Sequence, residues 1–296
     1  MSRMKSDLKY RLRVIKSVLL PEMVFERINC KRFLGVVPNL KNPKKYYEKL
    51  IWLKLHDKNE LLTTCADKYR VNEYIESCGY GNILKQVYGV YQKGEEIDFD
   101  RLPDRFFLKC NHDSGANVAV DKNKEFNKRK IIEFLNRKLK QNHYHLYHEW
   151  SYKNIKPCII AEEYLENKSG DPIVDYKFYC FSGKPVYFGI SVGEYNHLVR
   201  NHKFNSNLES VDKFFKDHSS MSEEEGRRYI PKEIDQMLKI AEDLSKPFKH
   251  VRVDLYNIDG RIIFGELTFY SNGGYVVIDN EETNLKLGEL IKIDEV

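Results

Sequence analysis

The feature of this sequence that most constrains its fold is a pair of β-hairpins with short turns. The runs VDYKFYCF (174–181) and KPVYFGISV are rich in β-branched and aromatic residues, and Ser182-Gly183-Lys184 separates them as a tight turn. HVRVDLY and RIIFGELTF flank the turn residues NIDG (257–260) in the same way. Short turns of this kind join antiparallel strands, so the chain is not expected to build a doubly wound parallel sheet.

Further strands and helices alternate along the rest of the chain. Four runs before residue 166 read as strands: QVYGVY, RFFLKCN, NVAVD and CIIAEEYL. Apolar periodicity predicts helices at 7–20, 41–56, 59–78, 124–141, 231–246 and 283–293. A polar, weakly periodic stretch at 201–230 predicts a long loop of the kind that covers an active site. Hairpins mixed with helices predict an α+β fold class.

Composition narrows the class of protein. Of 296 residues, 42% are hydrophobic, which is enough for a sizeable core. The 49 Lys and Arg against 44 Asp and Glu leave only +5, so we expect no nucleic-acid partner and rather an acidic or phosphate-bearing ligand. Six cysteines are scattered without a C-x-x-C pair, which indicates free thiols and a cytoplasmic location. No apolar run approaches the roughly 18 residues of a membrane-spanning helix.

The N-terminal helix expected at 7–20 has two interpretations. Its apolar residues Leu8, Leu12, Ile15 and Leu19 have helical spacing, and its basic residues lie mostly on other faces. A basic amphipathic helix of this kind can lie on an anionic membrane surface, which would put residues 1–20 at the inner face of the membrane. The other interpretation, which we favour, is a helix packed on the domain.

A polar loop between two strands forms the first candidate site. The strand FFLK brings Lys109 to the segment Asn111–Asn117, after which the chain continues as the strand VAV. Backbone N–H groups and hydroxyls in such a loop can bind phosphate oxygens, and the lysine adds a positive charge. The segment is neither a Walker A loop nor a G-x-G-x-x-G motif, and an ordinary hairpin is the alternative.

Two paired strands carry the second candidate site. Arg252 and Asp254 share one face of their strand, and Glu266 and Thr268 share one face of the next. Two carboxylates on one face repel each other unless a positive group lies between them. That group is either a hard cation such as Mg²⁺, bridging to phosphate, or Arg252 itself in a surface network.

Three further patterns in the sequence are weaker. Glu162 and Glu163 end a strand, where they are either solvated or placed to bind a purine edge. The segment Gly189–Gly193 matches G-x-S-x-G, but β-branched neighbours continue the strand through Ser191, which disfavours a serine hydrolase. A polar helix end explains three clustered histidines better than a zinc site does: His143, His145 and His148.

Taken in order, these parts resemble the ATP-grasp fold, and more specifically the TupA-like ATP-grasp family associated with teichuronopeptide and other surface-polysaccharide biosynthesis. The resemblance covers most of the chain from about 41 to 293. The sequence segments on which the resemblance rests are residues 48–75, 99–118, 152–165, 174–185 and 251–275. It implies two α+β subdomains that clasp ATP. We expect an N-terminal helical extension (1–60), a first subdomain with the phosphate loop (61–160) and a second with the adenine hinge and metal hairpin (161–296).

The resemblance also implies roles for individual residues. Lys109 and Arg252 are expected to be catalytic, with ATP and two Mg²⁺ ions as cofactors. The metal ligands would be Asp254 and Glu266, with Thr268 or Asn272 as a further ligand. The nucleotide would contact Lys68, Lys109, Asn111, Ser114, Gly115, Asn117, Glu162, Glu163, Tyr164, Leu165, Asp175 and Lys177.

The activity implied by the resemblance is ATP-dependent ligation of a carboxylate to an amine through an acyl phosphate. The carboxylate would belong to a uronic acid in a surface glycan, and the amine to an amino acid. Alternatives are a glycan kinase on the same fold and a nucleotide-binding module without turnover. The last is motivated by Asp113, where the family more often has glycine, and by Thr268, where many ATP-grasp enzymes carry Asn.

Overall fold

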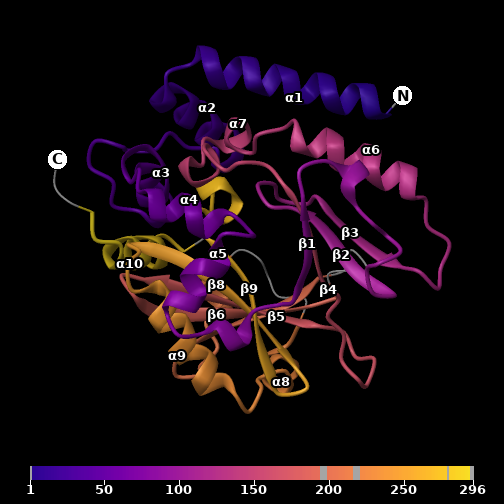
Figure 1. Ribbon diagram of the computed structural model, residues 1–296. Helices are drawn as coiled ribbons and strands as arrows, with labels where there is room; N and C mark the ends of the chain where they lie inside the picture. Colours follow the sequence, from indigo (N-terminus) through magenta and orange to yellow (C-terminus); the bar gives the residue numbers. More distant parts are fainter. Residues whose placement is uncertain (1, 194–198, 216–220, 279, 294–296) are drawn as a thin grey trace. The chain divides into compact units, whose positions relative to one another are not determined.

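The computed structural model describes residues 2–193, 199–215, 221–278 and 280–293, and only the backbone of residues 2–6 (Figure 1). The chain divides into two compact units, each assembled from separate stretches of sequence. Unit 1 comprises Met1–Glu26, Lys58–Tyr74 and Leu84–Tyr164. Unit 2 comprises Arg27–Asp57, Ile75–Ile83 and Leu165–Val296. The helix α2 (Glu22–Leu34) and the helix α5 (Val71–Ser77) run from one set of residues into the other.

Unit 1 is built on a four-stranded antiparallel sheet. Its strands are ordered β1 (Val87–Tyr91), β4 (Ile159–Glu163), β2 (Arg105–Cys110) and β3 (Asn117–Asp121). The strand β4 therefore lies between β1 and β2, although about 50 residues separate it from β2 in sequence. Its register places Glu162 opposite Phe107 on β2 and opposite Val87 on β1.

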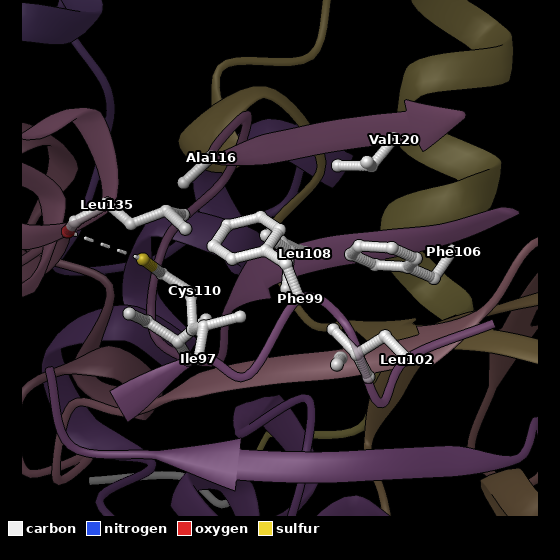
Figure 2. Close-up of a cluster of buried hydrophobic side chains, with 11 residues drawn as sticks. Ile97, Phe99, Leu102, Phe106, Leu108, Cys110, Ala116, Val120 and Leu135 are labelled. Carbon is white, nitrogen blue, oxygen red and sulfur yellow. Dashed lines mark hydrogen bonds between the residues drawn. The ribbon is translucent and has the colours of Figure 1, made fainter. Parts of the chain in front are cut away.

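The core of unit 1 lies on one face of this sheet. Alternate residues of β2 are buried, and Phe106, Leu108 and Cys110 all point towards the same apolar cluster (Figure 2). The helix α6 (Lys128–Leu139) covers this face with Leu135, whose carbonyl lies 4.0 Å from the Cys110 Sγ. The intervening residues of β2, which include Lys109, therefore belong to the other face of the sheet.

Three more helices belong to unit 1. These are α1 (Ser2–Leu19), α4 (Glu60–Ala66) and the short α7 (Tyr144–Tyr147). The helix α1 packs on α7, and α4 packs on the turn Trp150–Tyr152. His143, His145 and His148 lie at or next to α7 in this region.

Unit 2 is built on a five-stranded antiparallel sheet. Its order is β7 (Arg200–Asn205), β6 (Lys184–Val192), β5 (Val174–Phe181), β8 (His250–Ile258) and β9 (Arg261–Thr268). The helix α9 (Ile234–Ser245) covers one face, where the Cys180 Sγ lies 3.7 Å from the carbonyl of Ala241. The remaining helices of unit 2 are α3 (Tyr46–His56), α8 (Glu223–Arg228) and α10 (Glu281–Leu290).

Both predicted tight hairpins are confirmed. Ser182 and Gly183 join β5 to β6 with φ values of 48° and 78°, and Asp259 and Gly260 join β8 to β9 with φ values of 52° and 84°. Two successive positive φ values match the right-handed twist of the paired strands, which is why small or Asp residues and glycine occupy these turns. The α+β class expected from the hairpins and helices is likewise confirmed.

Two expected elements differ from the structure. The helix predicted over 59–78 is broken into α4 and α5, because the Asp67 carboxylate accepts hydrogen bonds from the backbone N–H groups of Tyr69 and Arg70 and turns the chain. The loop predicted over 201–230 contains the strand β7 and the helix α8, although its residues 216–220 lie outside the described residues. All six cysteines are free, as expected.

Candidate functional site

A lysine–glutamate–lysine cluster lies on the face of the unit 1 sheet opposite the apolar cluster. Glu162 of β4 pairs with Lys109 of β2 and, at 3.2 Å, with Lys85, which precedes β1. Strand register brings the three together, since β4 lies between the other two strands. The Glu162 side chain is 7% exposed, and those of Lys85 and Lys109 are 12% and 18% exposed. The cluster therefore concentrates two cations around one buried anion.

The charges of this cluster are strongly coupled. Burial alone would raise the pKa of Glu162, but Lys85 and Lys109 lower it to about 2. Burial lowers the pKa of Lys85 to about 8, although Glu162 opposes the change. Two lysines and one glutamate leave an excess positive charge in a largely desolvated place, which is the environment that an anionic ligand such as phosphate would neutralise.

The loop after β2 is fixed at its base by buried side chains. The Asn111 amide donates to the carbonyl of Lys156 at 2.9 Å, and its oxygen accepts from the Cys158 N–H at 2.8 Å. The His112 Nε2 donates to the carbonyls of Lys138 and Gln141 at the end of α6. Asn111, expected to contact the nucleotide, thus holds the base of the loop with its side chain.

Asp113 also points into unit 1 and away from solvent. Its carboxylate lies 2.7 Å from Lys138 Nζ and 3.5 Å from the Nδ1 of His143, whose Nε2 lies 3.5 Å from Glu149. Burial alone would raise the pKa of Asp113, but His143 and Lys138 lower it to about 2. Burial alone would lower the pKa of His143, but the two carboxylates raise it to about 9. We call Asp113, Lys138, His143 and Glu149 the loop anchor.

The tip of the loop is exposed. Ser114, Gly115 and Asn117 are open to solvent, and Gly115 has a φ of 90°, which a residue with a side chain rarely adopts. Lys68 lies beside the tip, because its Nζ donates to the Asp113 carbonyl at 2.9 Å. The structure thus leaves hydroxyl, amide and backbone groups of the tip available to a ligand, with a lysine close by.

The segment expected to bind adenine continues from β4. The Tyr164 ring stacks on Phe107 with the ring centres 5.0 Å apart, and the Arg105 guanidinium lies 4.1 Å from its centroid. The Glu163 carboxylate accepts from the Gln86 N–H at 3.2 Å. Glu162 and Glu163 thus use their side chains within unit 1, so an adenine would contact the backbone of this segment. Leu165 begins unit 2, where it packs with Ile258 and Ile263.

A continuous polar face runs across the unit 2 sheet, opposite α9. Register places Lys177 of β5 opposite Asp254 of β8, and Asp254 opposite Glu266 of β9. Asp175, two residues along from Lys177, pairs with it at 2.9 Å. These predicted residues of unit 2 therefore lie on the same face of three neighbouring strands: Asp175, Lys177, Arg252, Asp254, Glu266 and Thr268.

Arg252 is the centre of this face. It binds the Asp254 carboxylate through Nε and an Nη atom, each at 2.6 Å, and the same Nη lies 3.3 Å from Glu266 Oε1. The Thr268 hydroxyl accepts from Arg252 at 3.1 Å and donates to Glu266 at 2.8 Å. Burial raises the pKa of Asp254, and the guanidinium works against this rise. The positive charge of the Arg252 guanidinium thus offsets the negative charges of two carboxylates, Asp254 and Glu266.

A β-bulge positions Glu266 in this cluster. The register between β8 and β9 shifts after Asp254, so that Gly265 is an extra residue on β9. A Cβ on Gly265 would lie 2.8 Å from the Asp254 carbonyl oxygen and 3.1 Å from the Tyr256 ring. Only glycine fits there, and the bulge turns Glu266 to the same face as Asp254.

The chemistry of these donors fits Mg²⁺. Among the described residues, no cluster of three or more His, Cys, Asp or Glu side chains forms a cage for a metal. Mg²⁺ is commonly held by one or two carboxylates, with phosphates and waters completing its shell, and the two acids already share one positive group. Thr268 orients Glu266, and Asn272 lies on an exposed turn with a φ of 52°. Asp254 and Glu266 are thus the residues that would hold the ion.

Two alternative sites have structural explanations. Ser191 lies inside β6, paired with Asp175 and Asn201, so it does not occupy the strand–turn–helix position of a nucleophile elbow. The histidines have separate roles, because His143 belongs to the loop anchor while His145 and His148 both meet Ser17 of α1.

Sequence reasoning missed Lys85, His143 and Glu149 as parts of the site. Lys85 directly precedes the run QVYGVY, and a lysine at a strand start is too common to be informative by itself. Its meeting with Glu162 depends on the pairing of β1 with β4, which no local pattern reveals.

The match of a family model to most of the chain defines it as an ATP-grasp protein. It belongs to the family described as TupA-like ATPgrasp, which it matches over residues 48–292. No curated protein matches the chain.

Solved structures resemble the chain at low identity. A D-alanine–D-alanine ligase from Bacillus anthracis complexed with ATP is 15% identical, with a TM-score of 0.44 over 78% of this chain and 65% of that one. An L-amino acid ligase from Bacillus licheniformis is 14% identical, with a TM-score of 0.40 over 72% of this chain and 43% of that one. The chain thus covers less than two thirds of the length of either protein.

Proposed function

We propose that the protein is an ATP-dependent carboxylate–amine ligase. The observation that carries the proposal is the Asp254–Arg252–Glu266 cluster, in which two acids that can hold Mg²⁺ share the guanidinium of one buried arginine. Membership of an ATP-grasp family supports the same function. Unit 1 contributes Lys85, Lys109 and the loop tip as partners for phosphate oxygens.

The proposed reaction has two steps. An oxygen of the substrate carboxylate attacks the γ-phosphorus of ATP, the bond to the β–γ bridging oxygen breaks, and ADP leaves. The amine then attacks the acyl carbon, loses a proton and expels inorganic phosphate, which leaves an amide. Mg²⁺, when bound, neutralises phosphate charge during the transfer. Lys109 of unit 1 and Arg252 of unit 2 are each largely desolvated, which suits each of them to stabilise negative charge on phosphate oxygens.

We further propose that the carboxylate belongs to a uronic acid of a surface glycan and that the amine is an amino acid. This assignment is supported by the family resemblance alone, because no described residue identifies either substrate. Purified protein should therefore release ADP only when a uronic-acid glycan and an amine are both present, and the product should contain an amide.

The same assay distinguishes the alternatives. Release of ADP with phosphate transferred to a glycan hydroxyl, and without any need for an amine, would establish a kinase and overturn the ligase. Nucleotide binding without ADP formation across a panel of carboxylates and amines would indicate a binding module. One reason for considering a binding module was the acidic Asp113 in the phosphate loop. This reason is weaker because the Asp113 side chain is paired with Lys138 and His143 within unit 1 and does not lie at the exposed tip.

A further inference from the structure

In the described part of α1, two side chains on one side of the helix make hydrogen bonds to the rest of unit 1. The Tyr10 hydroxyl accepts from the Asn142 N–H at 2.7 Å. The Ser17 hydroxyl, almost fully buried, lies 3.0 Å from His145 Nδ1 and 2.7 Å from His148 Nε2. Residues seven apart lie on nearly the same side of an α-helix, so Tyr10 and Ser17 mark the packed side.

The opposite side of α1 is apolar and exposed. Each residue of an α-helix is rotated about 100° around the helix axis from the one before it. By this rotation, four apolar residues lie within about 60° of one another around the axis and about 180° from Tyr10 and Ser17. They form the α1 stripe and retain between 53% and 75% of their accessible surface: Leu8, Leu12, Ile15 and Leu19. The helix does pack on unit 1, as favoured from the sequence, but through the side that carries Tyr10 and Ser17, while the four residues of the stripe are exposed.

Apolar surface extends beyond this stripe. Val18 is 67% exposed, and Met23 and Val24, after the end of α1, are 43% and 41% exposed. A hollow of about 630 Å³ opens beside the helix, lined partly by Arg11 and Ile15. Soluble proteins rarely expose a contiguous apolar area of this kind unless something binds it.

The net charge of the chain is concentrated in the same segment. Residues 1–20 contain six basic side chains and one acidic side chain, which is a net charge of +5. The whole chain has 49 basic and 44 acidic residues, so the remainder holds 43 of each and is neutral. Lys9 and Arg11 are exposed on either side of the stripe. An apolar stripe flanked by positive charge is complementary to a partner that has an apolar interior beneath an anionic surface layer.

From this complementarity we propose that α1 docks the protein on an anionic lipid bilayer, lying in the interface with its stripe in the acyl region. Among the described residues, no helix combines the length and apolar character needed to cross a membrane. A second copy of the chain is a poorer occupant, because two segments of +5 would repel each other. Each basic residue near an anionic leaflet, by contrast, contributes to binding.

The test uses the full chain and sedimentation with two kinds of vesicle. One kind contains phosphatidylglycerol and phosphatidylcholine in equal parts, and the other contains phosphatidylcholine alone. We expect binding to the anionic vesicles that weakens as salt is raised, and roughly tenfold or more weaker binding to the neutral ones. The variant Leu12→Asn/Leu19→Asn should lose roughly tenfold or more in affinity, and Lys9→Gln/Arg11→Gln should bind less with a smaller salt dependence.

A control is Val277→Asn, which replaces an apolar residue of unit 2 that is 43% exposed and should bind as the unchanged protein does. Equal binding to both vesicles, binding to neither, or unchanged binding by the stripe variant would each overturn the proposal. Light scattering provides a second criterion. A mass that doubles with concentration, and returns to the monomer in the stripe variant, would show that a second copy covers the stripe instead of lipid.

Discussion

Glu266 decides between a metal site and a surface ion pair. Its side chain is 40% exposed and lies 3.3 Å from Arg252, so as a mere surface pair it would contribute about 0–1 kcal/mol to stability. In that case Glu266→Gln would leave turnover nearly intact. If Glu266 instead holds Mg²⁺, Glu266→Gln should lower the rate of ADP formation roughly a thousandfold, and the variant should need a higher Mg²⁺ concentration for its half-maximal rate.

The control for this substitution is Glu242→Gln, which removes an exposed carboxylate that pairs with Lys239 on α9. It should leave both turnover and the Mg²⁺ dependence unchanged. Asp254→Asn should resemble Glu266→Gln, and the double variant should lose less than the sum of the two in free energy, since both acids serve one cluster. Wild-type turnover by Glu266→Gln at limiting Mg²⁺ would place the metal elsewhere.

His143 makes the stability of unit 1 depend on pH. Its pKa is raised to about 9 by Asp113 and Glu149, above the unfolded value of about 6.5, and Lys138 pairs with the same Asp113. A raised pKa contributes stability that is complete below pH 6.5 and is lost as pH rises through 9. By this linkage the contribution is on the order of 3 kcal/mol.

The variant His143→Gln should remove this dependence. Thermal melts of both proteins between pH 6 and 9.5 should therefore converge as pH rises, with the unchanged protein more stable only at the lower end. The same variant should raise KM for ATP more than it lowers kcat, because it loosens the loop anchor without touching the reacting atoms. A difference in melting temperature that is constant across this range would show that His143 is not protonated in the fold.

At the scale of elements, hairpins were predictable because their causes are local. The turns at Ser182-Gly183 and Asp259-Gly260 need positive φ, and the residues that permit it stand at those positions. The strand β7 was not predictable, since its polar residues are buried by pairing with β6. Strand alternation grouped Arg252, Asp254 and Glu266, and the polar loop that follows its strand singled out Lys109. Lys85 required the pairing of β1 with β4.

The bulge in β9 yields a test at the same scale. Gly265→Ala places a Cβ 2.8 Å from the Asp254 carbonyl oxygen, so the two strands must separate or slip. We expect about 1–3 kcal/mol of destabilisation and a loss of turnover on the order of a hundredfold, because Glu266 and Asp254 move out of register. Chemical denaturation and the ADP assay measure the two effects.

Gly189→Ala is the matched control, since it also adds a methyl group within the unit 2 sheet. The nearest atom to a Cβ there is the Lys203 Cγ at 4.0 Å, an ordinary contact. This variant should keep both stability and turnover. If Gly265→Ala behaves like Gly189→Ala, the bulge does not position the carboxylates.

The reactivity of the cysteine thiols measures whether the protein as a whole stays folded. All six cysteines are free, and five are buried, with Cys78 the exception. Burial raises the pKa of Cys110, Cys158 and Cys180 to about 12, so they hold little of the reactive thiolate. A thiol reagent should therefore modify Cys78 quickly in the native protein and all six cysteines in denaturant.

The variant Cys78→Ser tests this assignment, because it should abolish the fast native reaction and leave five thiols in denaturant. Fast modification of a second native thiol would show that one of the two units opens on the time scale of the reagent. Mass spectrometry of the modified peptides would then identify the unit.

The loop anchor also limits how this family can change over generations. Asp113 is tolerated in a loop proposed to bind phosphate because Lys138 and His143 neutralise it, and His143 is in turn held by Glu149. A descendant that replaced Asp113 with glycine would leave the positive charges of Lys138 and His143 without that partner in the interior. We therefore expect relatives with glycine at this position to lack the histidine as well, so that these positions are inherited as a set.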